Sequence, residues 1–228
     1  MENSKAGRPV MGDWALDVCD GDVSPQTART LARLYLLIFD HGLARLVWKN
    51  RFEIAPGIWR SNQPAEADLA RMRAAGITTI VNLRGASNRG YRLLEDECCR
   101  GLGLDLVHIR LTAKRAPSRE TLLDLVDLIQ RLQPPLLLHC KSGADRTGFV
   151  AALWRLLREG DSVEAAMRQL SPRYGHFPRC RRGVQGQILR SYARDGAAEG
   201  LSFRSWVANR YSPDAVTRDF QHWLAGAR

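Results

Sequence analysis

The stretch that decides the fold is Leu136–Gly148, whose sequence is LLLHCKSGADRTG. Its apolar start predicts a short buried strand, and the apolar spacing from about residue 146 to 159 predicts a helix. A tight loop at the N-terminus of a helix points several backbone N–H groups at one spot and makes an anion-binding site. Gly143 and Gly148 permit sharp turning and close approach of the backbone. The stretch therefore predicts an anion-binding loop between a strand and a helix.

Two side chains of this loop indicate its chemistry. Cys140 stands at the start of the loop, where the positive field of a helix N-terminus lowers the pKa of the thiol and favours the nucleophilic thiolate. Arg146 carries a planar guanidinium that matches two phosphate oxygens. A nucleophile, a set of backbone N–H groups and a guanidinium together suit attack on phosphorus.

Three other kinds of site fit these residues less well. Gly143 and Gly148 match the first part of a Walker loop, but Phe149 and Val150 stand where that loop needs Lys and Ser or Thr. No second thiol or histidine lies at zinc-ligand spacing from Cys140, so no metal is predicted. Sulfurtransferase loops of the rhodanese type usually place the arginine one position closer to the cysteine. The alternative to any chemical site is that Cys140 is an inert, buried cysteine in a tight turn.

Outward from this stretch, short apolar runs alternate with segments of helical spacing. The alternation predicts a single α/β domain with a central, mainly parallel sheet flanked by helices. From about residue 161 onward the chain is predicted to be helical. The predicted strands are residues 57–60, 77–83, 104–109 and 136–139, and the predicted helices include residues 64–76, 91–102 and 118–129.

Three segments are expected along the chain. Residues 1–23 lack periodicity and are expected to form a loose N-terminal arm. Residues 24–51 are predicted to form an amphipathic helical extension, because Ser24 and Pro25 are typical of a helix start and an apolar stripe follows. This extension either packs on the domain core or lies on anionic lipid. Residues 52–228 are predicted to form the α/β domain, with a helical C-terminal part.

The chain is strongly basic. Lys and Arg number 34 against 24 Asp and Glu, which gives a net charge of +10. Residues 110–119 and 165–194 contain no Asp or Glu but several Lys or Arg. Such clusters attract phosphates, acidic proteins, nucleic acid or an anionic membrane face. The cysteine content, the short apolar runs and the lack of a visible secretory signal favour reduced thiols and a cytoplasmic protein.

The residues around Cys140 resemble the signature of the cysteine-dependent protein tyrosine phosphatase superfamily, a His-Cys pair followed after five residues by Arg-Thr-Gly. Together with Trp59–Pro64 and Val81–Gly85, they are similar to bacterial dual-specificity-like members over about residues 52–195. The resemblance implies a small α/β phosphatase fold that hydrolyses phosphomonoesters without metal or other cofactor. It implies a phosphorylated protein or phospholipid as substrate, and nucleic acid is not an expected partner.

The resemblance also implies a role for each residue of the loop. Cys140 would attack phosphorus and form a phosphocysteine, which water then hydrolyses. Arg146 would bind the phosphoryl oxygens and stabilise the transition state. His139 would order the loop and tune the thiolate, and Thr147 would hydrogen-bond the departing sulfur. The residues expected to bind the substrate are Lys141, Ser142, Gly143, Ala144, Thr147 and Gly148.

The sequence departs from the family at the general acid. Dual-specificity phosphatases usually supply an aspartate from a loop before the signature, but residues 109–119 hold no carboxylate. Asp145, inside the signature loop, resembles the aspartate of myotubularin-type lipid phosphatases and is our candidate. A bound phosphate dianion would favour its protonated form, as an acid requires. Alternatively, Asp145 only braces the loop, and Glu120, Asp124, the substrate or water supplies the proton.

Three functions are compatible with these residues. The first is a cytoplasmic protein tyrosine or dual-specificity phosphatase. The second is the same chemistry on a membrane phospholipid, with residues 24–48 holding the protein at the inner membrane face. The third is an inactive phosphate-binding module, and the intact Cys140 and Arg146 weigh against it.

Overall fold

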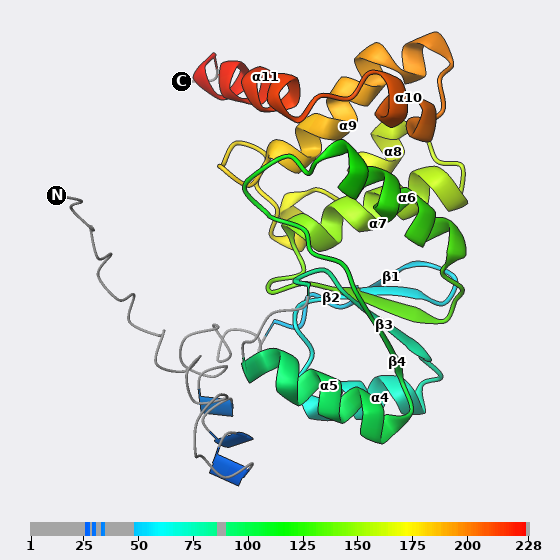
Figure 1. Cartoon of the computed structure of the whole chain (residues 1–228), viewed down its shortest axis with the longest axis vertical. Helices are drawn as coiled ribbons and strands as arrows, with labels where there is room; N and C mark the ends of the chain where they lie inside the picture. Colours follow the sequence, from blue (N-terminus) through cyan, green and yellow to red (C-terminus); the bar gives the residue numbers. More distant parts are fainter. Residues whose placement is uncertain (1–25, 28, 31–32, 35–47, 86–89, 227–228) are drawn as a thin grey trace, which may run out of the picture.

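The structure is a computed structural model that describes residues 26–27, 29–30, 33–34, 48–85 and 90–226 of the chain (Figure 1). The predicted N-terminal arm lies outside the described residues, as does most of the predicted helical extension. From Phe52 onward the described residues form a mixed α/β fold, which confirms the predicted fold class.

A five-stranded sheet forms the centre of the fold. The strand order is β1-β2-β5-β3-β4, and β1 is antiparallel to β2 while the other neighbours are parallel. The predicted, mainly parallel sheet is therefore confirmed, with β1 as an additional strand that the sequence pattern did not predict. The strands are β1 (Phe52–Ala55), β2 (Ile58–Ser61), β3 (Thr79–Asn82), β4 (Asp105–His108) and β5 (Leu136–His139).

Helices cover both faces of the sheet (Figure 1). On one face lie α4 (Glu66–Ala74) and α5 (Gly90–Leu102). The thicker layer on the other face contains the C-terminal part of the chain, which is helical. It consists of α6 (Arg119–Arg131), α7 (Asp145–Arg158), α8 (Val163–Met167), α9 (Val184–Asp195), α10 (Phe203–Asn209), α11 (Pro213–Ala225) and the 3-10 helices η1 (Pro172–Tyr174) and η2 (Ala197–Glu199).

The central strand β5 is buried along its whole length. Leu136 and Leu138 belong to the apolar core shared with α6 and α7, whereas Leu137 belongs to the core shared with α4 and α5. This division follows from the two-residue period of a strand, and burial on both faces is typical of parallel sheets. β5 therefore forms a firmly packed base for the residues that follow it.

Two ion pairs connect the described residues of the N-terminal extension to α4 and α5, the helices on one face of the sheet. Arg29 Nε lies 2.8 Å from Glu97 Oε2, and Arg33 Nη2 lies 3.0 Å from Glu66 Oε1. The four side chains are 33–56% exposed. Ion pairs between such exposed side chains contribute little to stability, so these two hold the extension against α4 and α5 only weakly.

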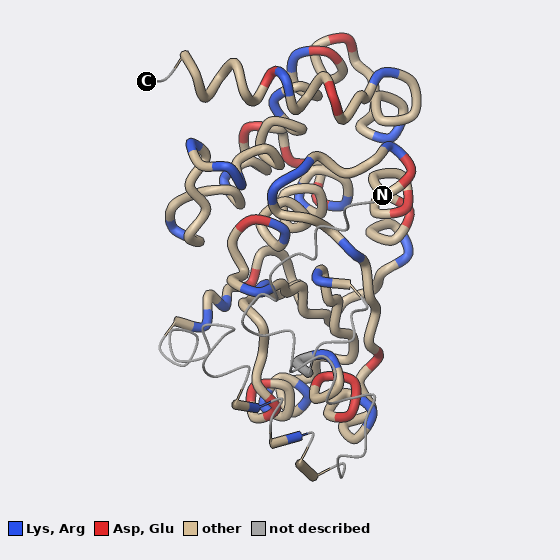
Figure 2. Tube along the Cα trace, turned by 60° about the vertical axis from the view of Figure 1, so that its left-hand side comes forward, with Lys and Arg blue, Asp and Glu red and all other residues tan. Residues whose placement is uncertain are grey.

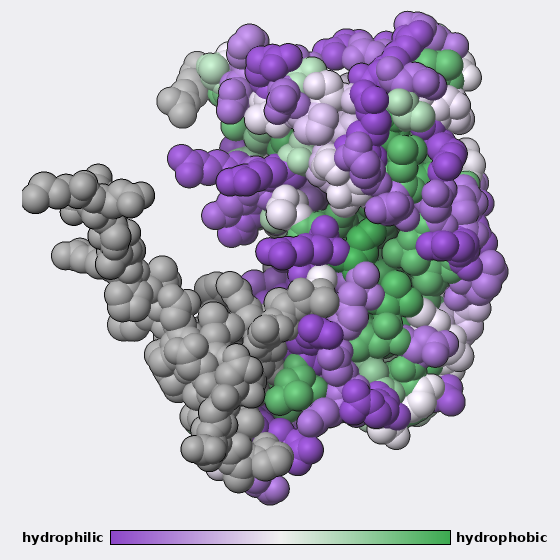
Figure 3. All heavy atoms as spheres, viewed as in Figure 1, coloured by the Kyte–Doolittle hydropathy of each residue, from purple (hydrophilic) through white to green (hydrophobic). Residues whose placement is uncertain are grey.

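The surface visible in Figure 3 is mainly hydrophilic, with a hydrophobic area around the edge strand β4 at the front of this view. The residues of β4 other than Asp105 are half-buried. Among the described helices, none has the length and apolar character that a membrane span needs.

Candidate active site

The predicted loop lies at the carboxyl end of the central strand. Residues 140–144 connect β5 to α7, which begins at Asp145. Cys140 follows β5 directly and is only 1% exposed. The predicted order of strand, tight loop and helix is therefore present, and Cys140 lies beside the positive end of the α7 dipole.

The surroundings of Cys140 favour its thiolate form. Burial alone would raise the pKa of the thiol. Burial is the largest single effect, but it is outweighed by the sum of the opposing ones: the positive charge of Arg146 and the hydrogen bonds from the Thr147 hydroxyl and from the backbone N–H groups of Thr147 and Gly143. The pKa of Cys140 is therefore lowered. A lowered thiol pKa is what a nucleophilic cysteine requires.

Both glycines of the loop stand where a side chain has no room. Gly143 has a φ of +74°, and a Cβ atom there would lie 2.7 Å from the backbone carbonyl of Ser61. A Cβ atom at Gly148 would lie 2.8 Å from the carbonyl oxygen of Gln169. Contacts with backbone atoms cannot be relieved by a side-chain rotation, so the tight packing of the loop depends on glycine at both positions.

Arg146 lies in the first turn of α7 and is oriented by its position in that helix. Its charge acts on Cys140. Its Nε atom is buried and has no hydrogen-bond partner among the described residues. The salt bridges found in the described part of the chain do not involve Arg146, so its charge is not neutralised by a protein carboxylate there. The guanidinium thus suits an incoming anion.

A buried polar network holds His139, the residue before Cys140. His139 Nε2 lies 3.0 Å from Glu95 Oε1, and both side chains are almost completely buried. Glu95 also accepts hydrogen bonds from the amides of Gln63 and Asn82. Burial would raise the pKa of Glu95, but His139 and the two amides lower it. Gln63 and Asn82 lie within the sequence patterns quoted above, whereas no sequence signal singles out Glu95.

Asp145 is buried between two basic side chains. Its Oδ1 atom lies 2.8 Å from His176 Nδ1, and its Oδ2 atom lies 4.0 Å from Arg182 Nε. His176 follows η1 and is completely buried. The sequence did not reveal this contact, because the two residues are 31 positions apart and His176 lies in a turn without periodicity.

The other carboxylate candidates lie on α6. Glu120 is held at the start of this helix by its own backbone N–H and by the Ser118 hydroxyl, and these hydrogen bonds lower its pKa. The loop before α6 is bonded to the C-terminal part of the chain. Gln185 of α9 donates a hydrogen bond to Thr112 O at 2.8 Å, and Tyr211, between α10 and α11, donates one to Pro117 O at 2.7 Å. A carboxylate that is already bonded at a helix start is a poor proton donor.

Basic side chains gather on the segment between η1 and α9. Figure 2 shows blue positions along this segment, and its sequence contains no acidic residue. Since Arg182 approaches Asp145, the segment borders the loop and adds a positive field that attracts anions. Its exposed cations are Arg179, Arg181 and Arg182, and the exposed Arg173 lies just before it in η1.

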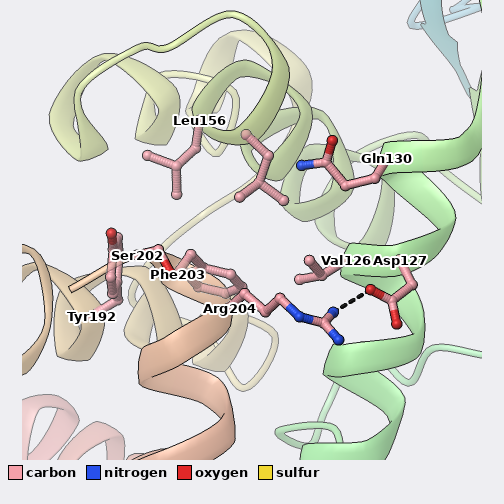
Figure 4. Close-up of a pocket in the computed structure, with 9 residues that line it drawn as sticks. Val126, Asp127, Gln130, Leu156, Tyr192, Ser202, Phe203 and Arg204 are labelled. Atoms are coloured by element: carbon pink, nitrogen blue, oxygen red, sulfur yellow. Dashed lines mark hydrogen bonds and ion pairs between the residues drawn. The ribbon is translucent and has the colours of Figure 1, made fainter.

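The cavity drawn in Figure 4 is a separate feature. It lies between α6, α7, α9 and α10, and an ion pair between Arg204 and Asp127 crosses its edge. None of the predicted site residues lines it. Across residues 48–85 and 90–226, no group of three or more His, Cys, Asp or Glu side chains is arranged to hold a metal ion.

Comparison with known proteins identifies the class of this chain. The family model described as DSP-PTPase phosphatase fused to NAD+ kinase matches residues 49–181, which is more than half of the chain. The chain therefore belongs to this family of dual-specificity-type, cysteine-dependent phosphatases. The predicted family resemblance is confirmed.

Individual relatives agree with this assignment. The dual specificity protein phosphatase TpbA of Pseudomonas aeruginosa (strain UCBPP-PA14) is 26% identical over 125 residues, which are 53% of this chain and 53% of TpbA. The chain thus spans about half the length of the curated relatives it matches.

Solved structures share the fold. The crystal structure of P. aeruginosa TpbA has a TM-score of 0.50 and 23% sequence identity, covering 71% of this chain and 92% of that one. The core catalytic domain of the PP-IP phosphatase SIW14 from S. cerevisiae has a TM-score of 0.52 and 20% identity, covering 70% of this chain and 94% of that one.

Proposed function

We propose that this chain is a phosphomonoester hydrolase of the protein tyrosine or dual-specificity type, working through a phosphocysteine intermediate. The observation that carries the proposal is a buried cysteine whose pKa is lowered by Arg146, Thr147 and a loop N–H group at the start of α7. Such a thiolate, facing an arginine without a carboxylate partner in the described structure, suits a phosphate group.

In the first step, the Cys140 thiolate attacks the phosphorus atom in line with the ester oxygen. The S–P bond forms and the P–O ester bond breaks, while Arg146 and the loop N–H groups bind the remaining phosphoryl oxygens. The leaving oxygen takes a proton from Asp145, our candidate acid. His176, which contacts Asp145 Oδ1, would hold this carboxyl in position.

In the second step, water attacks phosphorus and the S–P bond breaks. The proton released by water returns to the Asp145 carboxylate, and the electron pair of the S–P bond returns to sulfur. The Thr147 hydroxyl, which already stabilises the Cys140 thiolate, would stabilise the departing sulfur. Inorganic phosphate leaves and the thiolate is regenerated. We assign no metal or other cofactor to either step.

A phosphorylated protein is the substrate that we propose. For TpbA, a cysteine-to-serine variant has been crystallised with phosphotyrosine. A contact with an anionic membrane stays a prediction, because the predicted amphipathic extension lies mostly outside the described residues. The cytoplasmic location also stays a prediction.

Hydrolysis of para-nitrophenyl phosphate tests the activity. Its activated leaving group needs little help from an acid, so a competent thiolate should hydrolyse it. We expect turnover that persists in EDTA and is inhibited by vanadate, which can mimic the five-coordinate phosphoryl group. Phosphotyrosine and phosphoserine peptides, compared with phosphoinositide vesicles, then test the substrate class. Absence of turnover by folded protein would leave only a phosphate-binding module.

Arg146→Lys should reduce kcat/KM for para-nitrophenyl phosphate by more than a factor of about 100, because lysine keeps the charge but cannot make the two-pronged contact. Arg158→Lys, at the far end of the same helix, is the matched control and should keep wild-type activity. Activity of Arg146→Lys within threefold of wild type would show that planar recognition is not needed.

A further inference from the structure

Three consecutive carbonyl groups of the Cys140 loop are bonded to the segment that contains β1 and β2. The donors are groups of residues 50–63, and each of them bonds a different peptide of the loop. The bonds are Gln63 N to Lys141 O at 3.2 Å, Asn50 Nδ2 to Ser142 O at 3.0 Å and Arg60 Nη2 to Gly143 O at 2.6 Å.

These bonds fix the direction of the loop N–H groups. In a trans peptide, the carbonyl of one residue and the N–H of the next point in opposite directions. No peptide of residues 140–144 is cis. The N–H groups of Ser142, Gly143 and Ala144 therefore point away from the β1–β2 segment. The Gly143 N–H is the one that bonds the Cys140 sulfur, which agrees with this direction.

Arg60 is an unusual member of this arrangement because its guanidinium is completely buried. Besides Gly143 O, it donates to the backbone oxygen of Gln169 at 2.9 Å and to its Oε1 atom at 2.8 Å, and it lies 3.9 Å from the centre of the Tyr174 ring. Its Nε atom is buried without a partner, and no carboxylate in the described part of the chain pairs with it.

The charge of Arg60 survives this burial. Burial lowers the pKa of Arg60 to about 10, while the electrostatic interactions with Tyr174 and Cys140 act in the opposite direction. Arg60 is thus positively charged at neutral pH. Burying a charge that has no carboxylate partner costs free energy, so an anion bound in the neighbouring loop would stabilise the Arg60 guanidinium.

Asn50 supports the adjacent peptide in the same way. Its backbone has a φ of +47°, a conformation that asparagine tolerates better than most residues. Its side-chain amide is buried and donates to Ser142 O and, at 2.9 Å, to Tyr174 O. Asn50 therefore connects the loop to η1, the element that also contributes the ring beside Arg60.

We propose that Arg60 and Asn50 are positioning residues of the anion-binding loop: they turn its peptides so that the N–H groups face the anion, and Arg60 adds a second fixed positive charge. The proposal rests on the proposed function, because it treats the loop as the phosphate site. It deepens that function by assigning part of the affinity for phosphate to two residues of the β1–β2 segment, which bond the loop carbonyls on the side away from the anion.

The test measures alkylation of Cys140 by iodoacetamide against pH, followed by mass spectrometry of the Cys140 peptide, and protection by inorganic phosphate. In Arg60→Met, loss of a nearby positive charge should move the alkylation midpoint upward by about one pH unit and weaken protection about tenfold. Arg158→Met is the matched control, because Arg158 also binds three carbonyl groups, those of Ile129, Gln130 and Leu132. It should behave as wild type.

Asn50→Gly provides a second variant that keeps the backbone conformation and removes only the amide. We expect at least threefold weaker protection by phosphate with an unchanged circular dichroism spectrum. If Arg60→Met does not fold, this variant alone decides the question. Wild-type protection in Asn50→Gly, or a wild-type profile in folded Arg60→Met, overturns the proposal. Neither measurement needs turnover, so a wild type that binds phosphate but hydrolyses no ester would overturn only the proposed function.

Discussion

Cys140→Ser should lower kcat for para-nitrophenyl phosphate by at least a factor of about 10⁴, a loss typical of removing a covalent nucleophile. The serine hydroxyl fits the buried site, but it does not ionise near neutral pH as the thiol of Cys140 does. Arg146 and the loop N–H groups remain, so the variant should still bind inorganic phosphate. Steady-state kinetics gives the loss, and calorimetry of phosphate binding shows what is retained.

Cys98→Ser is the matched control for this experiment. Cys98 lies on α5, on the opposite side of the sheet from α7, and its sulfur contacts only the Glu66 carbonyl oxygen among the described hydrogen bonds. This control should retain wild-type turnover. Substantial activity in purified Cys140→Ser protein would mean that Cys140 is not the nucleophile.

The strand-loop-helix unit around Cys140 could be predicted because its signals are local. Three leucines mark a buried strand, two glycines permit the turn, and the apolar spacing after Arg146 marks a helix. The alternation of strands and helices also predicted the mainly parallel sheet. In contrast, β1 is only four residues long and forms through pairing with β2, so its short sequence carries no clear period.

The supports of the loop could not be predicted, because the fold brings them from distant positions. Glu95 reaches His139 from α5, and His176 reaches Asp145 from the turn after η1. Arg60 lies within a pattern that the sequence did single out, but its burial and its bond to Gly143 O depend on the pairing of β2 with β5. A single sequence shows that such residues exist but not which group each one contacts.

The geometry of Asp145 leaves two roles that make different predictions. A carboxyl held by His176 at 2.8 Å is well oriented, which suits a proton donor that must face the leaving oxygen. The same contact also suits a carboxylate that only braces the start of α7, where negative charge is stabilised by the helix dipole. The two roles differ in how strongly the reaction rate depends on the leaving group.

If Asp145 is the general acid, Asp145→Asn should slow hydrolysis of an unactivated aryl or alkyl phosphate by roughly 10²–10⁴-fold and that of para-nitrophenyl phosphate far less. A poor leaving oxygen needs a proton as the P–O bond breaks, whereas nitrophenolate leaves without one. The limb of the pH profile on which activity falls toward basic pH should also flatten, because the acid that titrates there is gone. Phenyl phosphate and para-nitrophenyl phosphate, compared over pH, measure both effects.

Asp161→Asn is the control for this last experiment, because Asp161 is paired with Arg155 at the far end of α7 and should affect neither substrate. An equal fall for both substrates in Asp145→Asn, with an unchanged pH profile, would assign Asp145 to the loop brace. The carboxylates of α6 would then be the next variants to examine, although Glu120 is already bonded at its helix start. The basic segment 110–119 would in that case serve substrate binding, since it has positive charge to attract a phosphate but holds no carboxyl group.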